Sequence, residues 1–341
     1  MQTLFFCAPG NLEWRETAEP SLQEPTDVLV RPIVVATCDL DTALVSGAAP
    51  IPGPFPLGHE GVAEVIAVGS AVERFSVGDR VIVPFQISCG KCQRCRRGLT
   101  ASCTTAPYGA MYGFEPFGGD WGGFLADLVR VPYADAMLIG LPGGIDPVVV
   151  ASMSDNIPDA WRTVGPYVGG FDVASAAVLI VGGAGPSVPY YPIGIARALG
   201  IGRVDYFDTD EERLAKAERL GATPIRHRRD IETLGYQLTI CTAQGASAIE
   251  TALRATEPDG VCTSNTISFE GDLVMPVLAM YTRGVRFVTG RVNARAAIPN
   301  VLELVACGAF DPGVVTDLVV DWSDAADALA GNWAKIVVHR P

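Results

Sequence analysis

Four of the nine cysteines lie close together in the sequence, with the spacing C-x2-C-x2-C-x7-C. Four thiolates at this spacing suit a closed tetrahedral zinc site, which holds a loop in place and leaves no position open for a substrate. An iron–sulfur cluster also uses C-x2-C-x2-C, but a proline usually follows the last cysteine of that run, and here Thr104 follows it. We therefore predict a structural zinc site in a lobe near residues 86–105. Its ligands are Cys89, Cys92, Cys95 and Cys103.

A glycine-rich turn follows an apolar run in the second half of the chain. The sequence VLIVGGAGPS predicts a strand, a turn and a helix, and in that order backbone N–H groups and a helix N-terminus bind a pyrophosphate. Asp208 closes the next predicted strand, where a carboxylate accepts hydrogen bonds from ribose hydroxyls and repels a 2′-phosphate. We predict a nicotinamide cofactor, NAD in preference to NADP. The residues predicted to bind it are Gly183, Gly185, Pro186, Ser187 and Asp208.

This turn departs from the usual three-glycine pattern. Ser187 or Val188 occupies the place of the third glycine, and Pro189 and Pro192 supply no backbone N–H. We therefore expect the helix to begin late, with Pro192 in its first turn.

The elements that position these residues differ between the two halves of the chain. The first half contains β-branched runs broken by Gly and Pro, with few helical periods, which predicts an irregular, barrel-like β domain. Its predicted strands include 28–37, 61–69 and 79–85.

From about residue 155, predicted strands alternate with helices, which indicates a doubly wound parallel sheet with a ligand crevice at the carboxyl ends of its strands. After the second strand, Thr209 and Glu212 predict a capping box at the start of a helix that ends at Gly221. A further helix is predicted at 299–308, in a tail that returns to the first domain. The predicted strands are 174–181, 203–208, 237–243, 260–267 and 285–290.

Length and composition indicate a folded protein of two domains. A chain of 341 residues is long for one core, and we divide it into 1–156 with 297–341, and 157–296. With 49% hydrophobic and 18% charged residues, the chain has enough apolar material for full cores. The net charge of −13 disfavours a nucleic acid as partner. We expect a small-molecule substrate, and neither nucleic acid nor membrane as partner.

The N-terminal sequence lacks the basic run, the apolar segment and the cleavage site of a secretory signal. The longest apolar runs are shorter than a membrane span. We therefore expect a cytoplasmic protein.

The stretch PLGHEGVAEVIAVGSAVERFSVGDRVIVPF, followed directly by the four-cysteine lobe, resembles the zinc-dependent medium-chain alcohol dehydrogenases. The later segments GDWGGFLADLVRVP and SDNIPDAWRTV and the glycine-rich unit extend the resemblance over nearly the whole chain. It implies an α/β protein with a GroES-like, β-rich catalytic domain and a Rossmann cofactor domain. It also implies hydride transfer between NAD(H) and a small alcohol or carbonyl compound, two zinc ions per chain, and a homodimer or homotetramer.

The resemblance implies that the second zinc ion is catalytic. The family binds this ion through a Cys at the end of an early strand, the His of Gly-His-Glu and a third Cys or Asp, and the matching positions are Cys38, His59 and Asp155. By residue type alone these could equally be a buried thiol, a structural histidine and a helix cap. Three protein ligands leave a fourth position open, where zinc polarises a substrate oxygen. Glu60 matches a residue that can approach the metal, and Asp41 matches a carboxylate that orients the ligand histidine.

Three further residues are candidates for the cofactor and substrate sites. Arg213 matches a family position that reaches the ribose, although a solvated helix arginine is the alternative. Tyr112 and Trp121, between the lobe and the second domain, are candidates for the substrate pocket or for ordinary packing.

The sequence also departs from the family at the proton path. Leu40 stands where a Ser or Thr often relays the alcohol proton, Ala43 where many members have His, and Ala63 where the signature has Gly. Thr42 carries the hydroxyl closest to Leu40 in sequence. The missing hydroxyl motivates an alternative function, reduction of an iminium or an activated alkene. Together with the irregular glycine loop, it also leaves open a catalytically inactive zinc- and nucleotide-binding protein.

Overall fold

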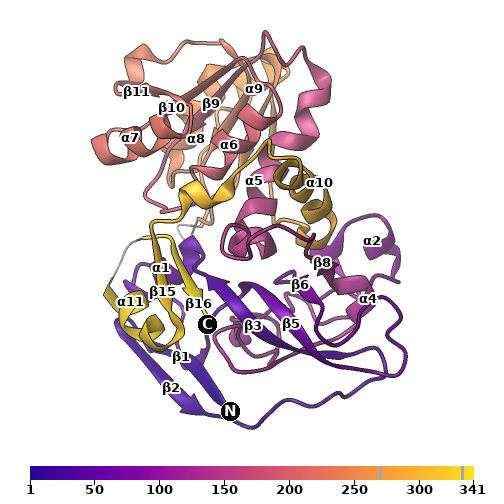
Figure 1. Cartoon of the computed structure of the whole chain (residues 1–341). Helices are drawn as coiled ribbons and strands as arrows, with labels where there is room; N and C mark the ends of the chain where they lie inside the picture. Colours follow the sequence, from indigo (N-terminus) through magenta and orange to yellow (C-terminus); the bar gives the residue numbers. More distant parts are fainter. Residues whose placement is uncertain (269–270, 332–333) are drawn as a thin grey trace. The chain divides into compact units, whose positions relative to one another are not determined.

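The computed structural model describes residues 1–268, 271–331 and 334–341, and these form two compact units (Figure 1). Residues Cys307–Val315 belong to unit 2, whereas the sequence assigned them to the first domain, because Phe310 is buried against Gly194 of unit 2. Unit 1 consists of Met1–Pro158, Val292–Ala306 and Thr316–Pro341, and unit 2 of Asp159–Arg291 and Cys307–Val315.

Unit 1 is built on β-sheets whose strands come from both ends of the chain. In the larger sheet the C-terminal strand β16 pairs antiparallel with β3, which also pairs antiparallel with β5 (Figure 1). Val30 and Val65 from β3 and β5 are fully buried, which is how alternating β-branched residues build one face of a core. The larger sheet has the order β15 (Leu318–Asp321), β16 (Ile336–His339), β3 (Val28–Ala36), β5 (Glu60–Val68), β6 (Arg80–Ile82) and β8 (Ile139–Gly140), with β7 (Val129–Val131) on β3. The smaller sheet has the order β2 (Asn11–Glu16), β1 (Gln2–Ala8) and β4 (Phe55–Pro56).

The helices of unit 1 are short and lie in the connections between strands. They are α1 (Asp39–Val45), α2 (Gln93–Arg96), α3 (Glu115–Gly118), α4 (Ala134–Met137), α10 (Ala294–Ala306) and α11 (Ala325–Gly331), with the 3-10 turns η1 (Thr100–Ser102), η2 (Ala151–Ser154) and η6 (Trp322–Asp324). The β-rich domain predicted for the first half is therefore confirmed.

Unit 2 contains a parallel sheet in the order β11-β10-β9-β12-β13-β14. The chain order reverses between β9 and β12, and in such sheets a ligand binds at the carboxyl ends of the two strands at the reversal. The predicted Rossmann fold is confirmed. The strands are β9 (Ala177–Val181), β10 (Arg203–Phe207), β11 (Thr223–Ile225), β12 (Tyr236–Cys241), β13 (Thr256–Ser264) and β14 (Arg286–Thr289). The helices are α5 (Asn156–Val164), which enters from unit 1, α6 (Tyr191–Ala198), α7 (Glu211–Arg219), α8 (Ala246–Ala255) and α9 (Val277–Arg283), with η3 (Gly165–Gly170), η4 (Arg228–Asp230) and η5 (Pro312–Val315).

Some predicted element boundaries are corrected by local hydrogen bonds. Strand β9 begins at Ala177 rather than at Ala174, because the Ala174 N–H donates to the Asp172 side chain in a turn. Helix α7 is capped by Asp210 and not by Thr209, since the Asp210 carboxylate accepts the Arg213 N–H at 2.9 Å.

The boundaries of two other helices bear on the predictions. Helix α6 begins at Tyr191 with a proline in its first turn, as the prolines of the loop predicted. Helix α10 begins at Ala294 and contains Pro299, whereas the sequence placed its start at Pro299, because the alanine-rich residues before the proline are strong helix formers.

Within the described ranges, each helix is too short or too polar to cross a lipid bilayer.

Candidate metal and cofactor sites

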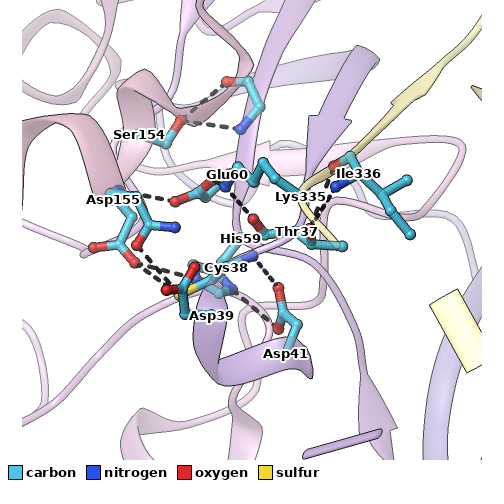
Figure 2. Close-up of polar contacts among 12 residues, drawn as sticks. Thr37, Cys38, Asp39, Asp41, His59, Glu60, Ser154, Asp155, Lys335 and Ile336 are labelled. Carbon is cyan, nitrogen blue, oxygen red and sulfur yellow. Dashed lines mark hydrogen bonds and ion pairs between the residues drawn. The ribbon is translucent and has the colours of Figure 1, made fainter. Parts of the chain in front are cut away.

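Three segments that are distant in sequence carry the predicted catalytic ligands to one place in unit 1 (Figure 2). Cys38 follows β3 and is the N-cap residue of α1. His59 directly precedes β5, and Asp155 lies between η2 and α5. Each predicted ligand therefore lies directly beside the end of a strand or the start of a helix, and the hydrogen bonds of that strand or helix hold its backbone in place.

The side chains of these residues point toward one another (Figure 2). The Cys38 thiol lies 3.5 Å from Asp155 Oδ2, and His59 Nε2 lies 3.3 Å from the same oxygen. Including Glu60, the four residues each offer one ligand atom, and these atoms all lie within 4.8 Å of one another. Cys38, His59 and Glu60 are buried, and Asp155 is half-buried. The structure thus brings the predicted ligand set together.

The electrostatics of this cluster favour a bound cation. Burial raises the pKa of the Cys38 thiol well above its usual value, and the carboxylates of Asp155 and Glu60 raise it further. Burial lowers the pKa of His59, but Asp41 and Asp155 outweigh this effect and raise it to about 9. Without a metal, the thiol keeps its proton and the imidazole binds a second one, and a divalent cation would replace these protons. One sulfur, one nitrogen and one carboxylate oxygen are donors that zinc accepts, so the residues fit this ion.

Asp41 connects two of the ligands. Its Oδ2 accepts the Cys38 N–H at 2.8 Å, and its Oδ1 lies 3.7 Å from His59 Nδ1. Asp41 Oδ1 and His59 Nδ1 are buried, and neither has a hydrogen-bond partner among the described residues. A small rotation of the imidazole on metal binding would pair these two atoms, which is how a carboxylate orients a ligand histidine.

The hydroxyl nearest to Leu40 in sequence, that of Thr42, is already engaged. Thr42 is buried, and its hydroxyl donates to the Asp39 carbonyl at 2.8 Å. Leu40, which occupies the position of the family's relay hydroxyl, packs against the apolar core. The described side chains at these two positions therefore present no free hydroxyl for a proton relay.

The four cysteines of the lobe also converge, with their sulfur atoms within 4.8 Å of one another. Backbone N–H groups donate to the sulfurs, as from Cys92 to Cys89 at 3.3 Å and from Cys95 to Cys92 at 3.4 Å. Backbone hydrogen bonds from Thr104 and Cys95 lower the pKa of Cys92 to about 5. Burial instead raises the pKa of Cys95 to about 12, so the case for a closed zinc site rests on the convergence of the four sulfurs. The Ala101 N–H of the same lobe donates to the Asn293 side chain of unit 1.

The glycine-rich loop follows β9 in unit 2, at the point where the strand order reverses. A Cβ atom at Gly183 would lie 2.7 Å from the Thr242 carbonyl oxygen, so only glycine fits between the two strand ends. The carbonyl of Ser187 accepts the N–H groups of Tyr190 and Tyr191 as α6 begins, and the Pro186 carbonyl accepts the Lys216 ammonium group at 3.1 Å. The predicted pyrophosphate residues therefore lie at the edge of the sheet where a dinucleotide would bind.

Asp208 and Arg213 form a bidentate ion pair at the end of β10. The Arg213 guanidinium donates to both carboxylate oxygens at 2.8 Å, while the N–H groups of Thr209 and Asp210 donate to Asp208 Oδ1. Arg213 is thus not a solvated helix arginine, because its guanidinium is paired with Asp208, the carboxylate predicted to bind the ribose.

The two aromatic residues predicted for the substrate pocket have different surroundings in unit 1. Tyr112 is fully buried in the core of unit 1, where its ring packs edge-on against Phe124 and its hydroxyl donates to the Arg130 carbonyl. Trp121 stacks with Arg130 and lines a cavity of about 340 Å³ whose described lining residues include none of the predicted metal ligands.

Several residues around the metal cluster were not predicted from the sequence. Phe114 and Phe85 flank the His59 ring, with centroid distances of 4.9 and 5.7 Å. Lys335, which is fully buried, donates to Glu60 Oε2 at 2.9 Å, and the Asn156 N–H donates to Glu60 Oε1 at 2.8 Å. A lysine before a short apolar strand carries no pattern that distinguishes it from a surface residue, so no sequence signal identified Lys335.

Comparisons with known proteins agree with this geometry. Residues 24–142 match the alcohol dehydrogenase GroES-like domain family. The chain is 33% identical over 229 residues to the glutathione-independent formaldehyde dehydrogenase of Pseudomonas aeruginosa, an alignment that covers 63% of this chain and 56% of that protein. It is 27% identical to an uncharacterized zinc-type alcohol dehydrogenase-like protein of Bacillus subtilis, with 95% and 94% of the two chains covered.

Solved structures extend the similarity to both units. The alcohol dehydrogenase of Thermus sp. ATN1 is 27% identical, covers the whole of both chains and has a TM-score of 0.90. The GroES-like domain, the converging zinc donors and the parallel cofactor sheet therefore occur together in one chain. The chain therefore contains an alcohol dehydrogenase GroES-like domain at residues 24–142 and is similar over nearly its whole length to zinc-type alcohol dehydrogenases.

Proposed function

We propose that this enzyme transfers a hydride between NAD(H) and a small alcohol or carbonyl compound at a zinc ion held by Cys38, His59 and Asp155. The observation that carries the proposal is the convergence of a thiol, an imidazole and a carboxylate in a buried cluster. Three protein donors leave one coordination position for a substrate oxygen. The completeness of this donor set disfavours the interpretation as an inactive protein.

A zinc ion bound at this site would act as a Lewis acid toward the substrate oxygen. The protein has to hold the three donors rigidly while one side of the site remains open. Asp41 supports both Cys38 and His59, and the rings of Phe85 and Phe114 cover the imidazole and exclude water from it. Exclusion of water strengthens the electrostatic interactions at the site.

Two observations bear on the substrate class. The curated relatives that share 33% identity are named formaldehyde dehydrogenases, which supports a small aldehyde or its alcohol as substrate. The engaged hydroxyl of Thr42 and the apolar Leu40 favour a second candidate, a reductase of iminium or activated alkene substrates that needs no alcohol proton relay.

A substrate panel separates these functions. Purified protein is assayed by NADH absorbance with small primary and secondary alcohols, formaldehyde and other small aldehydes, ketones, cyclic imines and activated alkenes, and its zinc content is measured. Two zinc ions per chain with turnover of alcohols or aldehydes support the first function. Turnover confined to imines or alkenes supports the second, and one zinc ion per chain without turnover contradicts both.

The ion pair between Asp208 and Arg213 predicts how the cofactor preference can be changed. We expect the natural enzyme to prefer NADH to NADPH by about tenfold or more in kcat/KM, a difference of ~1.4 kcal/mol. In Asp208→Asn the carboxylate charge is lost and the Arg213 guanidinium is released toward a 2′-phosphate. The NADH/NADPH ratio should therefore fall by about tenfold or more in steady-state assays with both cofactors.

The neighbouring carboxylate of Asp210 provides a control. It caps α7 by accepting the backbone N–H of Arg213, and it lies 3.6 Å from one guanidinium nitrogen without forming a bidentate ion pair. Asp210→Asn should keep the cofactor ratio of the natural enzyme. A natural enzyme that prefers NADPH would contradict the assignment of Asp208.

We also propose that the protein is a homodimer or homotetramer. Helix α9 presents a mostly apolar face, with Val277, Leu278 and Tyr281 at 66%, 77% and 84% exposure. A second copy of the chain would remove this face from water. The mass of the native protein in solution tests the proposal, and a monomer at micromolar concentration would exclude it.

A further inference from the structure

Lys335 is the buried cation of the metal cluster, and the proposed reaction does not use it. It lies directly before β16, and its side chain has no exposed surface. A buried ammonium group is tolerated only with close partners. Its described partners are the carboxylate of Glu60, also fully buried, and the carbonyl oxygen of Thr37 (Figure 2).

The partners of Lys335 belong to the segments that carry the metal ligands. Thr37 directly precedes Cys38, and Glu60 directly follows His59. The other oxygen of Glu60 accepts the N–H of Asn156, which directly follows Asp155. Lys335 and Glu60 together therefore connect all three ligand-bearing segments.

The position of Lys335 is set by strand pairing. The Thr37 N–H donates to the Ile336 carbonyl at 2.9 Å, and the Ile336 N–H donates to the Thr37 hydroxyl oxygen at 3.0 Å. Strand β16 then continues antiparallel to β3. The lysine is consequently held where its side chain reaches the metal cluster from the C-terminal part of the chain.

Glu60 lies close enough to the other donors to become a ligand itself. One of its carboxylate oxygens belongs to the group of donor atoms that lie within 4.8 Å of one another. A fourth protein ligand would convert an open zinc site into a closed one. Both Glu60 oxygens are instead occupied, one by Lys335 and one by Asn156.

We propose that Lys335 is a positioning residue that holds Glu60 away from the metal, so that Cys38, His59 and Asp155 remain the only protein ligands. The inference rests on the proposed function, because it concerns the same site. It assigns to the C-terminal strand a part in keeping the fourth coordination position free for substrate.

Cobalt(II) substitution tests this role through a signal other than activity, because the visible spectrum of bound cobalt reports the number and type of its ligands. The cobalt spectrum of Cys38→Ser is subtracted from that of the natural protein to remove the contribution of the four-cysteine lobe. The same difference spectrum is recorded for Lys335→Met, Lys335→Arg and the double variant Lys335→Met with Glu60→Gln.

Lys335→Met should change the cobalt spectrum toward an additional oxygen ligand and slow the release of this ion to a chelator. It should also lower kcat/KM by about 10-fold to 100-fold, the range found when residues that support metal ligands are changed. Lys335→Arg keeps a cation beside Glu60 and should retain the natural spectrum. The double variant carries neither charge of the buried pair and should regain the three-ligand spectrum, because an amide is a poor zinc ligand.

Thermal unfolding of each variant shows whether the comparison is made on folded protein. If Lys335→Met alone is unstable, the double variant, which leaves no unpaired charge from this pair, is compared with the natural protein instead. An unchanged spectrum in Lys335→Met would overturn the proposal. So would faster metal release that persists in the double variant, because the lysine would then have only a structural role. If the natural protein bound no cobalt through Cys38, the proposed function itself would fail.

Discussion

The variant His59→Ala is expected to lose about 1000-fold in kcat/KM, because the Lewis acid of the reaction contributes several kcal/mol and ~4 kcal/mol corresponds to three factors of ten. The imidazole is buried, lies 3.3 Å from Asp155 and is flanked by two aromatic rings, so water cannot replace it as a ligand without rearrangement. Metal analysis should find one zinc ion per chain in this variant, retained by the four-cysteine lobe, and two in the natural protein.

His227 provides a matched control, since it is exposed and lies in unit 2, away from the sequence segments that carry the ligands. His227→Ala should keep both zinc ions and the activity of the natural protein. If His59→Ala instead retained two zinc ions and full turnover, the proposed ligand set would be wrong.

The variant Cys95→Ser is expected to lose the other zinc ion and to lower the thermal stability of the protein. Cys95 is buried, its sulfur converges with three others, and the lobe contains only the short elements α2 and η1 to hold its backbone. Binding of a structural metal is coupled to folding. A net loss of ~3 kcal/mol would lower the melting temperature by roughly 6–12 °C for a domain of this size.

Differential scanning calorimetry with metal analysis measures this effect, and treatment of the natural protein with a strong chelator should reproduce it. Cys307→Ser is the control, because this cysteine is exposed and lies outside the lobe. An unchanged melting temperature in Cys95→Ser after loss of one zinc ion would show that the lobe does not depend on its metal. An iron content in place of zinc would favour the iron–sulfur alternative.

The local sites could be predicted from the sequence because their residues are close together in the chain. The four cysteines lie within one loop, so their spacing alone limits the geometry of the cluster. The glycine-rich turn and Asp208 are likewise identified by their places directly after two adjacent strands. Alternation of strands and helices was sufficient to predict a parallel sheet, since crossover helices impose that arrangement.

Element boundaries were less predictable because single hydrogen bonds decide them. Thr209 and Asp210 are both good N-cap residues, and Asp210 is the cap because its carboxylate accepts the Arg213 N–H. The predicted substrate role of Tyr112 depended on its residue type and on its place between the lobe and the second domain, and the structure buries this ring in the core.

By itself, the sequence determined the lobe, the cofactor turn and the class of each domain, because these depend on neighbours along the chain. Only the tertiary structure decided that Cys38 and Asp155, 117 positions apart, approach within 3.5 Å, and that Lys335 reaches Glu60 across 275 positions. Such contacts depend on strand pairing and core packing between distant segments. No pattern of residue types along the chain encodes which of several buried polar groups these forces will bring together.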